Sequence, residues 1–264
     1  MFRKTLTALV SIFLIAAVLT GCGAAEGVAE EEPVTLTLAA AASLKNVMDD
    51  EILPAFKEAY PHITVQPTYD ASGKLQSQIE SGAPVDLFIS ASLFNMEALR
   101  SKGLILEDSV ENLLENKLVL IVPARSQKGM STFADILKGD KIAIGDPASV
   151  PAGKYAKEAL ISLKLWDGVQ AKASLGTSVT EVLNWVAEGS ADAGVVYATD
   201  ARTTARVKVV AEAPAGSVSQ VLYPIGIIKA SANAEAAKDL IEYLKGEAAM
   251  KAFEKAGFIP AKMK

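Results

Sequence analysis

The segment Gly-Asp-Pro-Ala-Ser-Val-Pro-Ala-Gly, residues 145–153, joins an apolar run to an amphipathic helical pattern. Pro151 suits the first position of that helix, where its missing N–H would have no partner anyway. The next N–H groups, beginning with Ala152, lack an acceptor within the helix, and Val150 at the cap position has no side-chain oxygen to supply one. An anion fits such a helix start, whose dipole favours negative charge, and Gly153 would let it approach the backbone. A water-capped turn is the alternative.

Three more junctions carry hydrogen-bond donors at the start of a helical pattern. Ser43 follows four consecutive alanines, and Ser72 follows Tyr-Asp-Ala. Ser178 and Glu181 have the spacing of a capping box, in which each side chain bonds the backbone N–H of the other residue. The N–H of Val179 then remains free. Each serine alone is more often an ordinary helix cap, but several such junctions together favour a shared anion site.

Apolar runs of strand length alternate with helical patterns from residue 33 onward, which predicts an α/β architecture with parallel sheets covered by helices on both faces. Ligands of such folds bind at the carboxyl ends of the strands. Tyr197 ends one strand and is either a phenolic donor to that site or a core tyrosine with a hydrated hydroxyl. Pro54 interrupts one helical pattern, so we expect a kink or a restart near Glu51. The expected strands are 34–39, 63–67, 86–90, 117–123, 141–144, 169–173, 193–197, 207–210 and 220–229.

The N-terminus has the pattern of a bacterial lipoprotein signal. Arg3 and Lys4 precede an apolar run, residues 6–18, which is shorter than the ~20 residues that a membrane span needs. Cys22, the only cysteine, follows Leu-Thr-Gly and is the expected site of lipid attachment once residues 1–21 are removed, which would anchor a soluble domain outside the membrane. Residues 22–33, rich in glutamate, are expected to form a flexible tether. A secreted protein with a chance cysteine is the alternative.

Composition argues against several function classes. Removal of the two basic residues in the signal from the 26 of the full chain leaves 24 against 31 acidic residues, a net charge of −7, so nucleic acid is not an expected partner. The chain has one histidine, His62, and its one cysteine lies in the lipid signal, so Ser-His and Cys-His catalysis and histidine metal clusters are disfavoured. The carboxylates at 49–51 point to different sides of a helix and are expected in solvent.

Five sequence blocks, in this order and spacing, resemble the periplasmic molybdate-binding proteins of ABC importers. The most specific block combines Asp-Pro, Val-Pro-Ala-Gly and the following Tyr-Ala-Lys-Glu-Ala-Leu. The blocks are Ala-Ala-Ala-Ser-Leu at 40–44, Ala-Ser-Gly at 71–73, Ser-Gly-Ala-Pro-Val-Asp-Leu-Phe-Ile-Ser-Ala at 81–91, residues 145–160, and Gly-Val-Val-Tyr-Ala-Thr-Asp at 194–200. The resemblance extends from about residue 34 to the C-terminus.

The resemblance implies a type II periplasmic binding protein fold, with two α/β lobes, a hinge of two crossover strands and a ligand in the cleft between the lobes. Lobe 1 would contain residues 34–116 and 224–264, and lobe 2 residues 117–223. The crossovers would lie near 117–123 and 220–229, and helices at 234–244 and 247–256 would return to lobe 1. The implied ligand shell is Ser43, Ser72, Ala152, Val179 and Tyr197. One departure is Ser72-Gly73, where relatives often have a run of serines, which leaves the donor at that point open.

The implied function is that of a lipid-anchored, extracytoplasmic binding protein that captures molybdate, and tungstate as well, for delivery to a membrane permease. It would be a monomer without a cofactor, without catalysis and without direct protein ligands to molybdenum. A binding protein for another oxyanion such as sulfate is the nearest alternative, and an extracytoplasmic ester hydrolase is a more distant one. Lys45, Lys74 and Lys154 each follow a proposed donor by two residues, so we expect their ammonium groups to point into water at the rim of the cleft.

Overall fold

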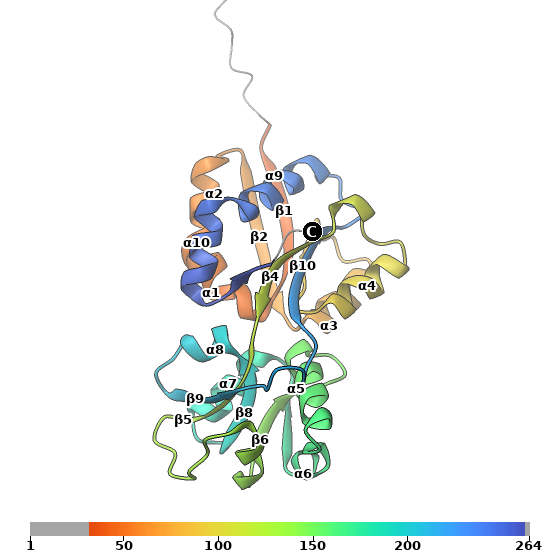
Figure 1. Ribbon diagram of the computed structural model, residues 1–264. Helices are drawn as coiled ribbons and strands as arrows, with labels where there is room; N and C mark the ends of the chain where they lie inside the picture. Colours follow the sequence, from red (N-terminus) through yellow and green to blue (C-terminus); the bar gives the residue numbers. More distant parts are fainter. Residues whose placement is uncertain (1–31, 262–264) are drawn as a thin grey trace, which may run out of the picture. The chain divides into compact units, whose positions relative to one another are not determined.

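Two β-sheets, each flanked by helices, make up the part of the chain that the structure describes (Figure 1). The structure is a computed structural model and describes residues 32–261; the expected signal peptide, Cys22 and the tether up to residue 31 lie outside that range. The sheet of lobe 1 has the strand order β11-β4-β10-β3-β1-β2. Its strands are β1 (Val34–Ala41), β2 (Ile63–Asp70), β3 (Leu87–Ile89), β4 (Glu111–Asn116), β10 (Val221–Ile227) and β11 (Ile259–Pro260).

The sheet of lobe 2 has the strand order β7-β6-β8-β5-β9. Both sheets are mixed: β1 pairs in parallel with β2 and β3, and β6 with β7 and β8, whereas β10 and β5 run antiparallel to their neighbours. The all-parallel expectation therefore holds only for the strands that end at the cleft. The strands of lobe 2 are β5 (Leu118–Pro123), β6 (Ile142–Gly145), β7 (Ala173–Gly176), β8 (Ala193–Tyr197) and β9 (Val207–Glu212).

Helices cover both sheets. A π-helical turn, Met48–Ile52, separates α1 from α2, and Pro54 lies in the first turn of α2, which confirms the restart expected near Glu51. The two C-terminal helices pack on lobe 1 as expected, since α9 contacts β1 and β10, and α10 contacts α1. The helices are α1 (Lys45–Val47), α2 (Leu53–Ala59), α3 (Ser72–Glu80), α4 (Leu93–Ser101), α5 (Pro151–Ser162), α6 (Trp166–Gln170), α7 (Val179–Ala187), α8 (Ala198–Arg202), α9 (Ala234–Lys245) and α10 (Glu247–Ala256), with short 3-10 turns at Ala42–Leu44, Glu107–Ser109 and Phe133–Lys138.

Two connections join the lobes, both visible between the sheets in Figure 1. The first crossing is a single residue, Lys117, between the end of β4 and the start of β5. The second is the segment 213–220 between β9 and β10. Because β10 pairs with β4 from Val221 onward, the boundary expected after residue 223 falls inside a strand of lobe 1, and the second crossing lies before that strand.

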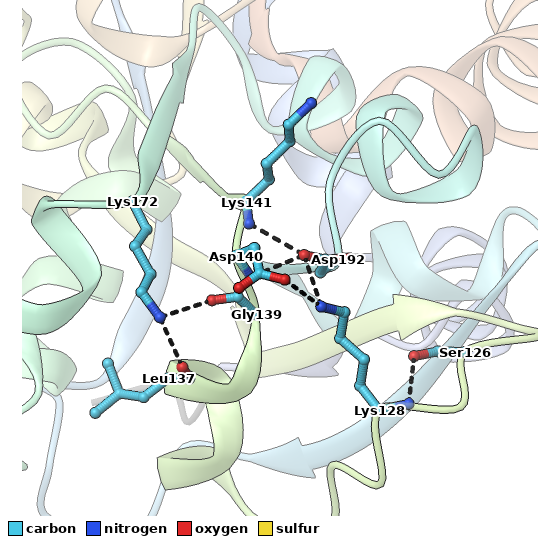
Figure 2. Close-up of polar contacts among 8 residues, drawn as sticks. All are labelled: Ser126, Lys128, Leu137, Gly139, Asp140, Lys141, Lys172 and Asp192. Carbon is cyan, nitrogen blue, oxygen red and sulfur yellow. Dashed lines mark hydrogen bonds and ion pairs between the residues drawn. The ribbon is translucent and has the colours of Figure 1, made fainter.

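Polar side chains fix the amino-terminal end of β6 in lobe 2 (Figure 2). Asp192 Oδ2 accepts the N–H groups of Asp140 and Lys141, at 2.8 and 3.1 Å. Lys172 Nζ donates to two carbonyls of the preceding turn, at 2.9 and 3.0 Å. The opposite, carboxyl end of β6 leads into α5 and the cleft.

The strand expected at 169–173 is wrong. These residues form the end of α6 and the turn before β7, which begins at Ala173. Val169 is buried as part of a helix, whereas β7 lies at the edge of its sheet with Leu175 52% exposed, so it lacks the alternation that marks a half-buried strand. The strands β4 and β11 were not expected, because β4 carries Glu-Asn at both ends and β11 has only two residues.

Candidate functional site

The five residues of the expected ligand shell line one small cavity between the lobes. Ser43, Ser72, Ala152, Val179 and Tyr197 all border it. Each lies at or shortly after the carboxyl end of a different strand, β1 and β2 in lobe 1 and β6, β7 and β8 in lobe 2. The cavity volume is about 10 Å³, close to the space of one water-sized sphere. With the lobes in this arrangement, the cavity suits one compact group and not a sugar or a peptide.

Ser43 lies in the short turn that follows β1. The cap of this turn is Ala41 and no side chain bonds its N–H groups, so Ser43 is not an ordinary helix cap. Its Oγ is 2.9 Å from the hydroxyl oxygen of Tyr223. Tyr223 lies on β10, is fully buried and was not among the expected site residues, because it reaches Ser43 only through the pairing of distant strands.

Ser72 is the first residue of α3 and is 1% exposed. It is not a helix cap either, since that position belongs to Ala71. Its Oγ accepts the N–H of Ala91, after β3, at 3.0 Å. A hydroxyl has one hydrogen to donate, so the Ser72 hydrogen remains available to the cavity. The next N–H, that of Gly73, donates across the lobes to the Ser149 carbonyl at 3.1 Å.

Helix α5 begins with a proline and without a side-chain cap at Val150, as expected. Its first regular helical bond runs from the Lys154 N–H to the Val150 carbonyl, at 3.0 Å, so the N–H groups of Ala152 and Gly153 have no helical acceptor. The expectation for Gly153 is wrong, because a Cβ there would overlap the carbonyl of Gly145 at the end of β6. Gly153 allows the helix to pack on the strand and leaves no space for a ligand on that side.

Helix α7 begins with a modified capping box. The Ser178 Oγ accepts the Glu181 N–H at 3.2 Å, as expected. The Glu181 carboxylate, however, accepts the N–H and hydroxyl of Thr177, at 2.6 and 2.9 Å, so it reaches one residue further back than the Ser178 N–H. Val179 is the first helical residue and is 5% exposed. Its N–H has no acceptor among residues 32–261.

Tyr197 ends β8 and is almost fully buried. Its hydroxyl lies 3.4 Å from the Ala91 carbonyl of lobe 1, which is long for an O–H···O bond. Burial raises the pKa of Tyr197 well above its usual value, so the hydroxyl keeps its hydrogen and acts as a donor. Behind it, the buried Asp200 accepts the Tyr197 N–H at 3.2 Å, and burial raises the pKa of this carboxyl to about 7.

Among the described residues, one charged side chain lines the cavity, that of Asp70. Its Oδ1 accepts the Ala71 N–H at 2.7 Å and lies 3.3 Å from the ammonium of Lys74, so its charge is partly compensated. No cation is among the lining residues that the structure describes. An anion in this cavity would be held by O–H and N–H dipoles and not by a counter-ion.

The expectation for the three lysines holds for two of them. The side chains of Lys45 and Lys74 are 59% and 41% exposed and pair with carboxylates on their own side of lobe 1. Lys154 differs, since its Nζ lies 2.8 Å from the centre of the Phe94 ring, which belongs to α4 of lobe 1. Lys154 therefore bridges the lobes by a cation–π contact, and desolvation lowers its pKa.

The described residues lack the features of metal sites and of membrane spans. Within the range 32–261, no group of three or more His, Cys, Asp or Glu side chains is placed to hold a metal ion. The helices of that range are also too short or too polar to cross a membrane. The acidic run 49–51 is partly or fully exposed, and Asp49 bonds Lys45 and the Tyr69 hydroxyl, both at 2.6 Å, as expected for a solvated face.

The sequence matches the family model of the bacterial extracellular solute-binding proteins over residues 36–259. The chain belongs to this family. A similar solute-binding protein is the molybdate-binding protein of Haemophilus influenzae, 38% identical over 228 residues that cover 84% of this chain and 89% of the relative. A Bacillus subtilis protein assigned as a substrate-binding lipoprotein of an ABC transporter is 41% identical over 262 residues, or 98% of this chain and 99% of the relative.

Solved structures of solute-binding proteins have the same two-lobed fold. One from Clostridium difficile, assigned as the substrate-binding domain of a molybdenum ABC transporter, is 41% identical with a TM-score of 0.69 and covers 87% of this chain and 100% of that chain. The periplasmic molybdate-binding protein of Azotobacter vinelandii has a TM-score of 0.76 over 86% of this chain and 100% of that chain; at 24% identity this likeness shows the fold alone. The type II periplasmic binding protein fold is confirmed.

Proposed function

We propose that this solute-binding protein captures molybdate or tungstate in the cavity between its lobes and delivers it to an ABC permease. The convergence of neutral donors on one cavity carries the proposal. A tetrahedral dianion presents acceptors in every direction, and donors fixed before it arrives stabilise it with little reorganisation. The donors are the hydroxyls of Ser43, Ser72 and Tyr197 and the N–H groups of Ala152 and Val179.

The relatives support the choice of anion within this chemistry. A small cavity with converging hydroxyl and N–H donors fits any compact tetrahedral oxyanion, sulfate included. The Haemophilus influenzae relative is named for molybdate and the Clostridium difficile structure for molybdenum, and both are similar to this chain over most of its length. Molybdate and tungstate are therefore the expected ligands, and sulfate is the alternative ligand whose affinity must be measured alongside them.

The proposed location is the outer face of the cell membrane, with a monomeric domain held by a lipid on Cys22. The Leu-Thr-Gly-Cys sequence supports this, as does the lipoprotein relative in Bacillus subtilis. Cys22→Ala should move the protein from the membrane fraction to the soluble fraction and leave the affinity for molybdate unchanged. Membrane retention of unaltered protein without a lipid adduct by mass spectrometry would reject the anchor.

Isothermal titration calorimetry of the purified protein tests the function. We expect molybdate and tungstate to bind with one site per chain, and at least about tenfold more tightly than sulfate or phosphate, a difference of about 1.4 kcal/mol. Tighter binding of sulfate would make the protein a sulfate carrier. Absence of heat with all four anions, or hydrolysis of acyl or phosphate esters that requires Ser43 or Ser72, would reject the binding function.

A further inference from the structure

Asn116 and Tyr223 lie behind Ser43 and are not among the residues that line the cavity. Asn116 ends β4 at the first crossing between the lobes, and its Oδ1 accepts the Lys117 N–H at 2.8 Å. A backbone N–H can only donate, so this bond identifies the amide oxygen of the side chain. The amide nitrogen, Nδ2, must then face the other way. It donates to the Tyr223 hydroxyl at 3.2 Å and to the hydroxyl of Thr199 at 2.8 Å.

These contacts have one consistent direction. The Tyr223 hydroxyl accepts from Asn116 and has a single hydrogen of its own, with the Ser43 Oγ 2.9 Å away. If Ser43 donated to Tyr223 instead, the Tyr223 hydrogen would be left without an acceptor in a fully buried position, which is unfavourable. Burial also raises the pKa of Tyr223 well above its usual value, so this hydrogen is retained. Tyr223 therefore donates to Ser43, and the Ser43 hydrogen is left for the cavity.

We propose that Asn116 and Tyr223 are positioning residues that hold the Ser43 hydroxyl as a donor toward the bound oxyanion. This inference rests on the proposed function. The chain of bonds from Asn116 through Tyr223 to Ser43 is called the donor relay below. Because Asn116 also bonds Thr199 in α8 of lobe 2, the donor relay links the direction of the Ser43 hydroxyl to the contact between the lobes.

A double-mutant cycle on the full-length protein tests the donor relay. Calorimetry with molybdate is performed on the unaltered protein, Tyr223→Phe, Ser43→Ala and the double variant. Tyr223→Phe keeps the ring and removes only the hydroxyl, so Ser43 loses its fixed direction; we expect the affinity to fall about threefold to tenfold. In the Ser43→Ala background the same change should have no effect, because the group that it directs is already absent.

Tyr243→Phe is the matched control, since Tyr243 packs against Phe56 and Tyr60 in lobe 1, away from the cavity. Its affinity should equal that of the unaltered protein, and urea unfolding should show all variants folded. An equal loss on Tyr223→Phe with and without Ser43 would overturn the donor relay, as would unchanged binding of Tyr223→Phe. If the unaltered protein does not bind molybdate or tungstate, the proposed function fails and the donor relay fails with it; normal binding with an additive cycle rejects the donor relay alone.

Discussion

The Ser72 hydroxyl has two partners: its oxygen accepts the buried Ala91 N–H and, in our proposal, its hydrogen is donated to the anion. Ser72→Ala should therefore weaken both stability and binding. An unpaired buried N–H costs about 1–3 kcal/mol of unfolding free energy, and a lost bond to a charged ligand about 1.5–3 kcal/mol, or roughly tenfold to 150-fold in affinity. Urea unfolding without ligand measures the first effect, and calorimetry of the folded variant measures the second.

Ser77→Ala is the control for Ser72→Ala, because Ser77 lies on the same helix and its hydroxyl donates to the Gly73 carbonyl on the exposed side. It should leave the affinity unchanged. A Ser72→Ala protein that loses stability but binds molybdate normally would limit Ser72 to holding Ala91 in place.

Asp200 should make stability depend on pH near neutrality. Its pKa in the folded protein is about 7, above the value of about 3.9 for an unfolded chain. The folded state therefore holds a proton on Asp200 that the unfolded state has lost between these values, so the contribution of Asp200 to stability is fully present below pH ~4 and is lost as the pH rises to about 7. Between pH 5 and pH 7 the fall is at most about 3 kcal/mol. Urea unfolding of Asp200→Asn should show a smaller decrease over this range.

Asp192→Asn serves as the comparison for Asp200→Asn. The hydrogen bonds from Lys141 and Asp140 and the ion pair with Lys128 outweigh partial burial and lower the pKa of Asp192, so it does not titrate between pH 5 and pH 7. Its removal should shift stability by the same amount at both values. Equal slopes for Asp200→Asn and the unaltered protein would show that Asp200 is ionised throughout the range.

At the scale of elements, helix α5 carries two lysines over aromatic rings with different consequences. The Lys154 ammonium contacts Phe94 of the other lobe, whereas Lys157 lies 5.1 Å from the Trp166 ring of its own lobe. Lys154→Met should weaken molybdate binding about twofold to fivefold, since an exposed cation–π contact contributes about 0.5–1 kcal/mol and this one forms only when the lobes meet. The loss should appear in the dissociation rate measured by stopped flow.

Lys157→Met removes the same charge and the same kind of contact, but within lobe 2. The affinity of this variant for molybdate should therefore equal that of the unaltered protein. Equal losses in the two variants would mean that net charge, and not the bridge between lobes, supports binding.

Local rules predicted the elements whose causes are local. The start of α5 follows from Pro151 and the apolar cap Val150, and the interruption of α2 follows from Pro54. The same rules brought the five site residues to strand ends that meet at the cleft, although their contact with an anion stays a prediction. What failed depends on partners distant in sequence. A glycine is required at position 153 because the Gly145 carbonyl occupies the place of a Cβ. The strand β7 was missed because it is an edge strand whose exposed face lacks the alternation of a half-buried strand.

The hinge shows the same limit on sequence interpretation. Asn116 and Tyr223 are 107 residues apart in the sequence and lie on different strands. Neither residue lies in a motif that marks a ligand site. Their importance for Ser43 arises from the antiparallel pairing of β4 with β10. A sequence read in windows of one helix or strand contains no signal for such a contact.

On the scale of the whole molecule, several contacts between described residues join the lobes around the cavity, and the bond from Asn116 to Thr199 is one of them. They come from both sides of the cleft and include hydrogen bonds, a long O–H···O contact and a cation–π contact. A ligand that binds only when the lobes meet must stabilise this arrangement, by about 2.7 kcal/mol at 100 times its Kd. The others are the Gly73 N–H to the Ser149 carbonyl, Lys154 over Phe94, and the long contact of the Tyr197 hydroxyl with the Ala91 carbonyl, which Tyr197 would exchange for a bond to the anion.

Gly73 allows the start of α3 to approach the backbone of Ser149 across the cleft. A Cβ on this residue would overlap the Ser149 carbonyl oxygen and lie 2.9 Å from the Ser149 Cα; both are backbone atoms, which cannot rotate away as a side chain can. Within α3 itself, alanine is favoured over glycine. Gly73→Ala should therefore leave the free protein at least as stable as the unaltered one, yet hinder closure. We expect about a tenfold loss of affinity for molybdate, or about 1.4 kcal/mol.

Small-angle scattering with and without saturating molybdate should show less compaction for Gly73→Ala than for the unaltered protein. Gly168→Ala is the control, since a Cβ there meets only the flexible Leu137 side chain within lobe 2, and it should bind and compact normally. Full affinity and full compaction of Gly73→Ala would mean that the lobes close on the anion without the contact between Gly73 and Ser149, and that the ligand-bound cleft is wider than the one described here.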